Sequence, residues 1–145
     1  MLGMQWHPVM MEYFGTDTRP TVAACMDRVT SSDLLLLIVA FRQGWVPKPD
    51  AGGNGVDSIT ALELAAARQR GIEVIALLGS EDWPGSLWEK APEARAWMEK
   101  FRSELNLMAV FFEREGPGSK LELFKAKVRQ ALVTHQQRLL TRAGG

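Results

Sequence analysis

The sequence predicts a three-layer α/β/α domain, in which a mainly parallel sheet of about four strands is covered by helices on both faces. Residues 33–41, 72–78 and 107–112 have the length and the branched or aromatic composition of strands, and residues 6–11 form a weaker fourth. Their continuous apolarity is typical of strands that are buried on both sides. Helical patterns lie between them, and this alternation favours parallel strands joined by right-handed crossovers.

Length and composition indicate the class of protein. A chain of 145 residues is about one domain, so we expect residues 1–145 to fold as a single unit. The 17 basic side chains balance the 17 acidic ones, which argues against a nucleic-acid partner. Cys25 alone cannot form a disulfide framework, which fits a cytoplasmic setting. The longest apolar run, 34–41, is too short for a bilayer, and the N-terminus does not resemble a signal peptide, so we expect no membrane association.

Two helices are well marked. In residues 91–105, Pro92 suits the first helical position, and an apolar face is expected to pack on the sheet. The last helix is expected to open at Ser119, which has capping-box spacing to Glu122. Six basic residues follow Ser119 against one Glu, a pattern typical of a solvated helix face.

A ligand site in such a fold lies beyond the carboxyl ends of the strands. Two long loops rich in Gly, Pro and Trp, 42–57 and 79–92, reach this edge, and long loops in compact domains are commonly functional. Aromatic walls with a few charged groups are typical of small-molecule sites. The candidate lining residues are Glu12, Tyr13, Arg42, Trp45, Glu63, Asp82, Trp83 and Arg114.

Several chemistries lack their residues. The segment "GGNGVDSI" has neither the lysine nor the spacing of a phosphate-binding Walker loop, and Gly-x-Gly-x-x-Gly is absent. Only His7 and His135 could act as imidazole ligands or bases, so a metal site or a Ser-His-Asp triad is not expected. We predict no cofactor and no metal. We expect His135 to be a partly exposed helix residue and Cys25 to be a small core residue.

Glu63 is the remaining candidate for chemistry, and two interpretations compete. It lies at the margin of the apolar side of a helix, near the expected carboxyl edge of the sheet, where a buried carboxyl could assist cleavage of a glycosidic bond. Alternatively, "TALE" is a capping box, with Thr60 as N-cap and Glu63 reaching back to its amide. If the helix begins instead at Asp57 or Ser58, Glu63 is one turn too far in to cap.

Four segments resemble the family catalogued as domain of unknown function 4062: "PVMMEYFG", "SDLLLLIVAFRQGWVP", "SITALELAAARQRGIEVIALL" and "LELFKAKVRQAL". The family is similar in fold to TIR domains and nucleoside deoxyribosyltransferases, which implies a flavodoxin-like strand order. By this resemblance Glu63 falls where related enzymes keep a catalytic glutamate that cleaves an N-glycosidic bond. The other motif positions are Glu12, Arg42, Ser58 and Thr60.

One departure from the family pattern matters for the sheet. Family members usually begin with a further strand, a Ser/Thr-rich loop and a helix, so this chain is expected to be an N-terminally incomplete domain. In a flavodoxin-like order the missing strand lies in the middle of the sheet, and its loss leaves unpaired backbone. Strand exchange in a dimer, direct pairing of the neighbouring strands, or a misplaced start codon would each account for the gap.

These observations leave three candidate functions. The first is a TIR-like signalling domain that acts through protein–protein assembly, as a homo-oligomer or with another protein. The second is a hydrolase or transferase acting on the N-glycosidic bond of NAD or a nucleoside. In it Glu63 is the nucleophile or stabiliser, Arg42 binds phosphate or carboxylate, and Trp45 or Trp83 stacks on the base of the nucleotide-like ligand. The third is a degenerate partial domain.

Overall fold

The computed structural model describes residues 21–81, 83–106, 109–112 and 120–144. Within these ranges the chain forms a three-stranded sheet in the order β1-β2-β3, with both pairs of neighbours parallel. Leu37 of β1 is opposite Ala76 of β2, and Ala76 is opposite Ala109 of β3. The strands are β1 (Leu34–Val39), β2 (Glu73–Gly79) and β3 (Ala109–Phe112).

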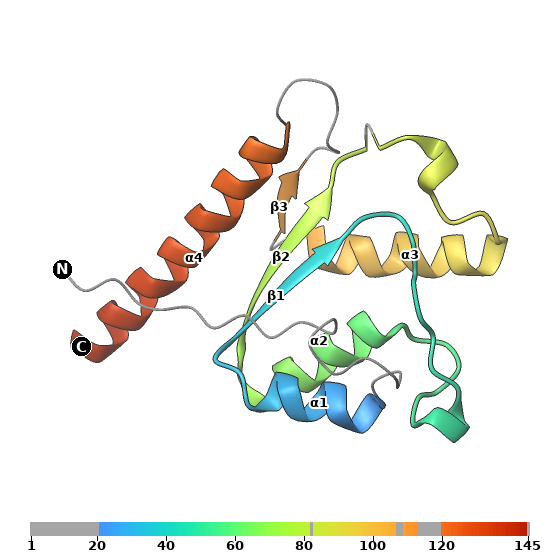
Figure 1. Cartoon of the computed structure of the whole chain (residues 1–145), viewed down its shortest axis with the longest axis horizontal. Coiled ribbons are helices and arrows are strands. Elements are labelled where there is room, and N and C mark those ends of the chain that lie inside the picture. The colour runs from blue at the N-terminus through green and yellow to red at the C-terminus, as the bar shows by residue number, and fades with distance from the viewer. Residues whose placement is uncertain (1–20, 82, 107–108, 113–119, 145) are drawn as a thin grey trace.

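Helices alternate with the strands along the chain (Figure 1). The α-helices are α1 (Val22–Thr30), α2 (Ile59–Arg70), α3 (Pro92–Leu105) and α4 (Lys120–Gly144), and two short 3-10 helices are η2 (Pro49–Ala51) and η3 (Gly85–Leu87). The predicted strands at 33–41 and 72–78, the described part of the predicted strand at 107–112, and the helix starting at Pro92 are therefore confirmed. The predicted strand at 6–11 and the cap at Ser119 lie outside the described residues.

The main core forms on one face of the sheet, where α2 and α3 pack. Alternate residues of β1 and β2 point to this face because successive strand residues face opposite sides. The buried cluster consists of Leu37, Val39, Leu64, Ala76, Leu78, Met98, Phe101 and Leu105. The apolar face of residues 91–105 therefore packs on the sheet, as predicted.

The opposite face is covered at one side by α4. Ile75 and Leu77 of β2, which alternate with the core residues, are buried on this face. Glu73, in the same alternation, accepts hydrogen bonds from His135 and Arg138 of α4. Ile38 of β1 points to this face too, but it is 55% exposed. The covering by helices on this face therefore reaches β2 and leaves part of β1 open to solvent.

The expectation for His135 is wrong. The residue is 1% exposed, and its ring nitrogen Nδ1 contacts the Glu73 carboxylate. A partly buried acid at the start of β2 requires a hydrogen-bonding partner, and α4 supplies one at the turn that crosses β2. Arg138, one turn later, belongs to the basic run that was expected to be a solvated face, and it forms an ion pair with the same carboxylate.

No α-helix in the described part of the chain combines the length and the apolar character needed to cross a bilayer.

Candidate functional site

The start of α2 decides between the two interpretations of Glu63. Ser58, not Thr60, is the N-cap: its backbone is extended and its hydroxyl accepts a hydrogen bond from the amide of Ala61. The helix begins at Ile59, so Glu63 lies in its second turn, beyond the amides that a capping carboxylate can reach. The capping-box interpretation of "TALE" is therefore wrong.

Glu63 instead lies half-buried on the side of α2 that faces α1. The two helices lie side by side (Figure 1), and the charge of Glu63 acts on Cys25 of α1. Burial raises the pKa of the Glu63 carboxyl, and among the described residues it has neither a hydrogen bond nor an ion pair. Burial, and then the Glu63 charge, also raise the pKa of the Cys25 thiol. Cys25 is 2% exposed, which confirms it as a core residue.

Trp45 joins the loop after β1 to this helix pair. Its side chain packs against the buried cluster of Val22, Cys25 and Ile59. Its carbonyl accepts a hydrogen bond from the amide of Ile59, at 2.9 Å, which ties the loop to the first residue of α2. Trp45 and three other predicted site residues, Ser58, Thr60 and Glu63, therefore lie near the start of α2, where the indole of Trp45 packs against the buried cluster.

Arg42 contributes to a different part of the edge. Its Nε donates a hydrogen bond to the carbonyl of Leu87, at 3.2 Å. The next residue, Gln43, donates its amide to the Glu89 carboxylate, and the Glu89 amide donates to the carbonyl of Phe41. These contacts fasten the start of the 42–57 loop to the end of the 79–92 loop. Arg42 is thus engaged in loop structure rather than directed at Glu63.

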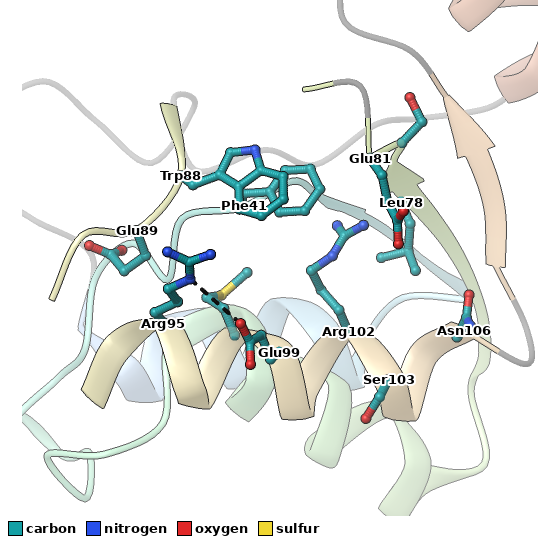
Figure 2. Close-up of a pocket in the computed structure, with 12 residues that line it drawn as sticks. Phe41, Leu78, Glu81, Trp88, Glu89, Arg95, Glu99, Arg102, Ser103 and Asn106 are labelled. Carbon is teal, nitrogen blue, oxygen red and sulfur yellow. Dashed lines mark ion pairs between the residues drawn. The ribbon is translucent and has the colours of Figure 1, made fainter. Parts of the chain in front are cut away.

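A pocket of ≈ 530 Å³ opens at the carboxyl ends of β1 and β2, between the 79–92 loop and α3 (Figure 2). Its apolar surface includes Phe41, Leu78 and Met98, all of them buried. The indole of Trp88 stacks on the Phe41 ring, with centroids 4.3 Å apart and planes 4° apart. The remaining lining residues are Ser80, Glu81, Glu89, Arg95, Glu99, Arg102, Ser103 and Asn106.

Arg102 is the fixed charge of this pocket. Its guanidinium donates to the carbonyls of Val39, Ala40 and Gly79, which lie at the carboxyl ends of β1 and β2. It also lies 3.9 Å from the centroid of the Phe41 ring. Burial lowers the pKa of Arg102, and the charge of Glu81 opposes this effect. The side chain is long enough to leave the buried stripe of α3 and carry its charge to the end of the sheet.

The predicted site residues thus divide into two groups. Trp45, Ser58, Thr60 and Glu63 meet at the start of α2, whereas Arg42 and Trp83 lie where the two loops meet, with the Trp83 ring 6.4 Å from that of Phe41. Glu12, Tyr13, Asp82 and Arg114 lie outside the described residues.

Sequence reasoning missed three residues of the pocket: Phe41, Trp88 and Arg102. Phe41 is the last residue of a predicted strand, and Trp88 lies in the 79–92 loop, where a tryptophan is as well suited to a ligand wall as to a partner contact. A signal for Arg102 was present, because it lies one turn after Met98, at the margin of the buried face that Met98, Phe101 and Leu105 form on α3. An arginine there must find acceptors at a sheet end or in a pocket.

Within the described ranges, no three His, Cys, Asp or Glu side chains come close enough together to hold a metal ion.

Comparison with known proteins gives one match. The family model described as "Domain of unknown function (DUF4062)" matches residues 1–136, which is most of the chain. Neither the curated proteins nor the solved structures contain a significant match.

Proposed function

Because this chain belongs to the family described as domain of unknown function (DUF4062), a description that assigns no activity, we propose a function from geometry: a TIR-like assembly domain. It acts in the cytoplasm, as part of signalling, by pairing with a second copy through the edge and open face of β1. The single observation that carries the proposal is the exposure of Ile38.

Ile38 is unusual for its position. Parallel strands normally have helices over both faces, and the neighbours of Ile38 in β1, Leu37 and Val39, are buried on the core face. On the other face, Leu77 of β2 is completely buried while Ile38 is 55% exposed. β1 is also an edge strand of the sheet that the described residues form. Exposed apolar edges of this kind invite pairing with another chain.

A second copy of the chain satisfies both features at once. Two β1 edges related by a twofold axis can pair antiparallel, which makes the contact self-complementary and brings Ile38 of each copy to the same apolar patch. The balanced 17 basic and 17 acidic residues create no net repulsion between copies. Such pairing would join the two three-stranded sheets into one continuous sheet of six strands.

The test is the oligomeric state of the wild-type protein and of two arginine variants. Sedimentation velocity over a hundredfold concentration range should give a dimer for wild type and a monomer for Ile38→Arg. Val56→Arg is the matched control, because Val56 is a β-branched residue of similar exposure (60%) in the 42–57 loop, away from β1. A wild-type monomer throughout, or a dimer that survives Ile38→Arg, would refute the proposal.

A second candidate function rests on Glu63. Its carboxyl is half-buried, has a raised pKa and does not cap the helix. Such a group is suited to act as nucleophile or stabiliser in cleaving the N-glycosidic bond of NAD or a nucleoside. Trp45, whose carbonyl accepts the amide of the first residue of the same helix, would supply an aromatic ring for a nucleotide-like ligand. No other feature of the described residues supports a particular substrate.

Release of nicotinamide from NAD, and of free base from nucleosides, tests this candidate directly. Purified wild type and Glu63→Gln are compared at high concentration, with Glu104→Gln, an exposed acid of α3, as control. Turnover that disappears only in Glu63→Gln supports the enzyme. Absence of turnover in wild type, or equal turnover in all three proteins, contradicts it without affecting the assembly proposal.

A further inference from the structure

The pocket between α3 and the 79–92 loop is separate from Glu63 and from the open face of β1, and neither proposed function uses it. Three of its features bear on what it could bind: apolar lining surface, a stacked aromatic pair, and a fixed cation. All three come from elements that the core holds in place. The pocket also lies where parallel sheets commonly bind ligands, beyond the carboxyl ends of the strands.

The volume and the apolar surface set the size and the character of a ligand. A pocket of ≈ 530 Å³ is within the range of sites for small molecules, about 300–1,000 Å³. Leu78 and Met98 contribute apolar surface to the lining. The rings of Phe41 and Trp88 lie above α3 (Figure 2). A flat ring is the shape that fits beside stacked aromatic side chains.

The cation that favours an anionic ligand in this pocket is Arg102. Arg102 donates to three main-chain carbonyls, and these contacts use its two terminal nitrogens and not Nε. Carbonyl dipoles solvate the guanidinium but do not neutralise it, and no described carboxylate forms an ion pair with it. A half-buried cation beside apolar surface gains most from a ligand that brings a compensating negative charge.

Three acidic side chains also line the pocket, Glu81, Glu89 and Glu99, and two of them have partners other than Arg102. Glu89 accepts the amide of Gln43, and Glu99 pairs with Arg95 at 3.5 Å on the exposed surface of α3. Glu81 acts on Arg102 only through space. Arg95 lies 5.6 Å from the Trp88 ring, and its exposed pair with Glu99 is weak enough to exchange for a ligand anion. The site thus has one fixed cation and a second that can turn toward it.

We propose that this pocket binds a small molecule made of a flat ring with one anionic group, the ring packing beside Trp88 and Phe41 and the anion meeting Arg102. A carboxylate and a phosphate share this chemistry. An aromatic acid and a nucleoside monophosphate are therefore the two sources that an experiment must distinguish.

Calorimetric titration of the whole chain with matched probes tests the proposal. The pairs are naphthalene-2-carboxylate with its neutral carboxamide, and adenosine monophosphate with adenosine. At least one anion should bind about tenfold more tightly than its neutral partner, a preference that weakens as salt is added. The pair with the tighter anion identifies carboxylate or phosphate as the preferred group. If no anion binds at about 1 mM, or each anion only equals its neutral partner, the proposal fails.

Variants locate the binding. Arg102→Gln should abolish the preference for the anion, and Trp88→Leu should weaken the anion and the neutral probe together, by about tenfold. Arg70→Gln, an exposed arginine at the end of α2, is the matched control and should bind like wild type. Because Arg102 also holds the strand ends and its variant can misfold, Trp88→Leu carries the test alone in that case. Unchanged binding in Trp88→Leu overturns the assignment of this pocket.

Discussion

Replacing Ser58 by Ala tests where α2 begins, and with it the environment of Glu63. The Ser58 hydroxyl accepts the Ala61 amide at 3.3 Å, and Ser58 is only 1% exposed, so water cannot substitute for the lost oxygen. Losing an N-cap costs about 1 kcal/mol, within a range of roughly 0.5–2, and the buried amide places Ser58→Ala in the upper half of this range. For a domain of this length the midpoint of thermal unfolding should fall by about 3–6 °C.

The assay is thermal and urea unfolding followed by circular dichroism, with Thr60→Ala as the matched control. Thr60 lies inside the helix, so its replacement should change the free energy of unfolding by less than about 0.5 kcal/mol. The capping-box alternative predicts the opposite order, because it makes Thr60 the cap. A Thr60→Ala variant as unstable as Ser58→Ala, or a Ser58→Ala variant as stable as wild type, would refute the placement of the helix start.

Glu63→Gln extends the same test to the pH dependence of stability. Burial raises the pKa of Glu63 in the folded state, so its contribution favours folding below the unfolded pKa and is lost as the pH rises through the folded pKa. At neutral pH the ionised carboxylate therefore opposes folding, and Glu63→Gln should be at least as stable as wild type. At acid pH, where wild-type Glu63 is protonated, the two proteins should converge. A loss of stability in Glu63→Gln at neutral pH would contradict this reasoning.

Three further predictions concern the scaffold. Burial alone would raise the pKa of Glu73, but the hydrogen bonds from its histidine and arginine partners on α4 hold it below its usual range. Its contribution to stability is therefore present above the unfolded pKa of about 4.3 and is lost as the pH falls through the folded pKa. Glu73→Gln should accordingly flatten the acid side of the stability–pH profile. An unchanged profile would contradict this. Leu105→Ala should lower the urea-derived free energy of unfolding by about 2–5 kcal/mol because Leu105 is fully buried, and a loss below about 1 kcal/mol would count against the core described. Gly53→Ala should destabilise the protein strongly, since a Cβ there would lie 2.1 Å from the carbonyl oxygen of Pro47, whereas Gly85→Ala meets nothing within 4 Å; equal melting temperatures for the two variants would refute the loop geometry.

The sequence was sufficient for the strands and for α3 because their signals are local. Continuous apolar runs identify buried strands, and the spacing of Met98, Phe101 and Leu105 identifies the buried face of α3. The capping-box interpretation failed because Ser58 and Thr60 are both favourable N-cap residues in isolation. The choice between them depends on the Trp45 carbonyl, which receives the Ile59 amide, and that contact cannot be read from local spacing.

The site was harder to predict than the fold because its parts are brought together by long-range contacts. Arg102 meets carbonyls more than twenty residues away on two different strands. The sequence predicts His135 as a partly exposed residue of a basic helix, because its partner Glu73 lies 62 positions earlier in the chain. Pairing of this kind depends on how α4 crosses the sheet, and helix periodicity alone does not specify it.

The hydrogen bonds between the two long loops couple the movements of these loops. Phe41, Arg42 and Gln43 are joined to Leu87 and Glu89 by three hydrogen bonds, and the Phe41–Trp88 stack lies between them. The start of the 42–57 loop and the end of the 79–92 loop, about 45 residues apart in sequence, therefore cannot move independently. The loop that begins at Phe41 also reaches the start of α2 through Trp45. A displacement of Trp88 is therefore transmitted through the Phe41 ring, the backbone from Phe41 to Trp45 and the hydrogen bond from Ile59 to the helix that carries Glu63.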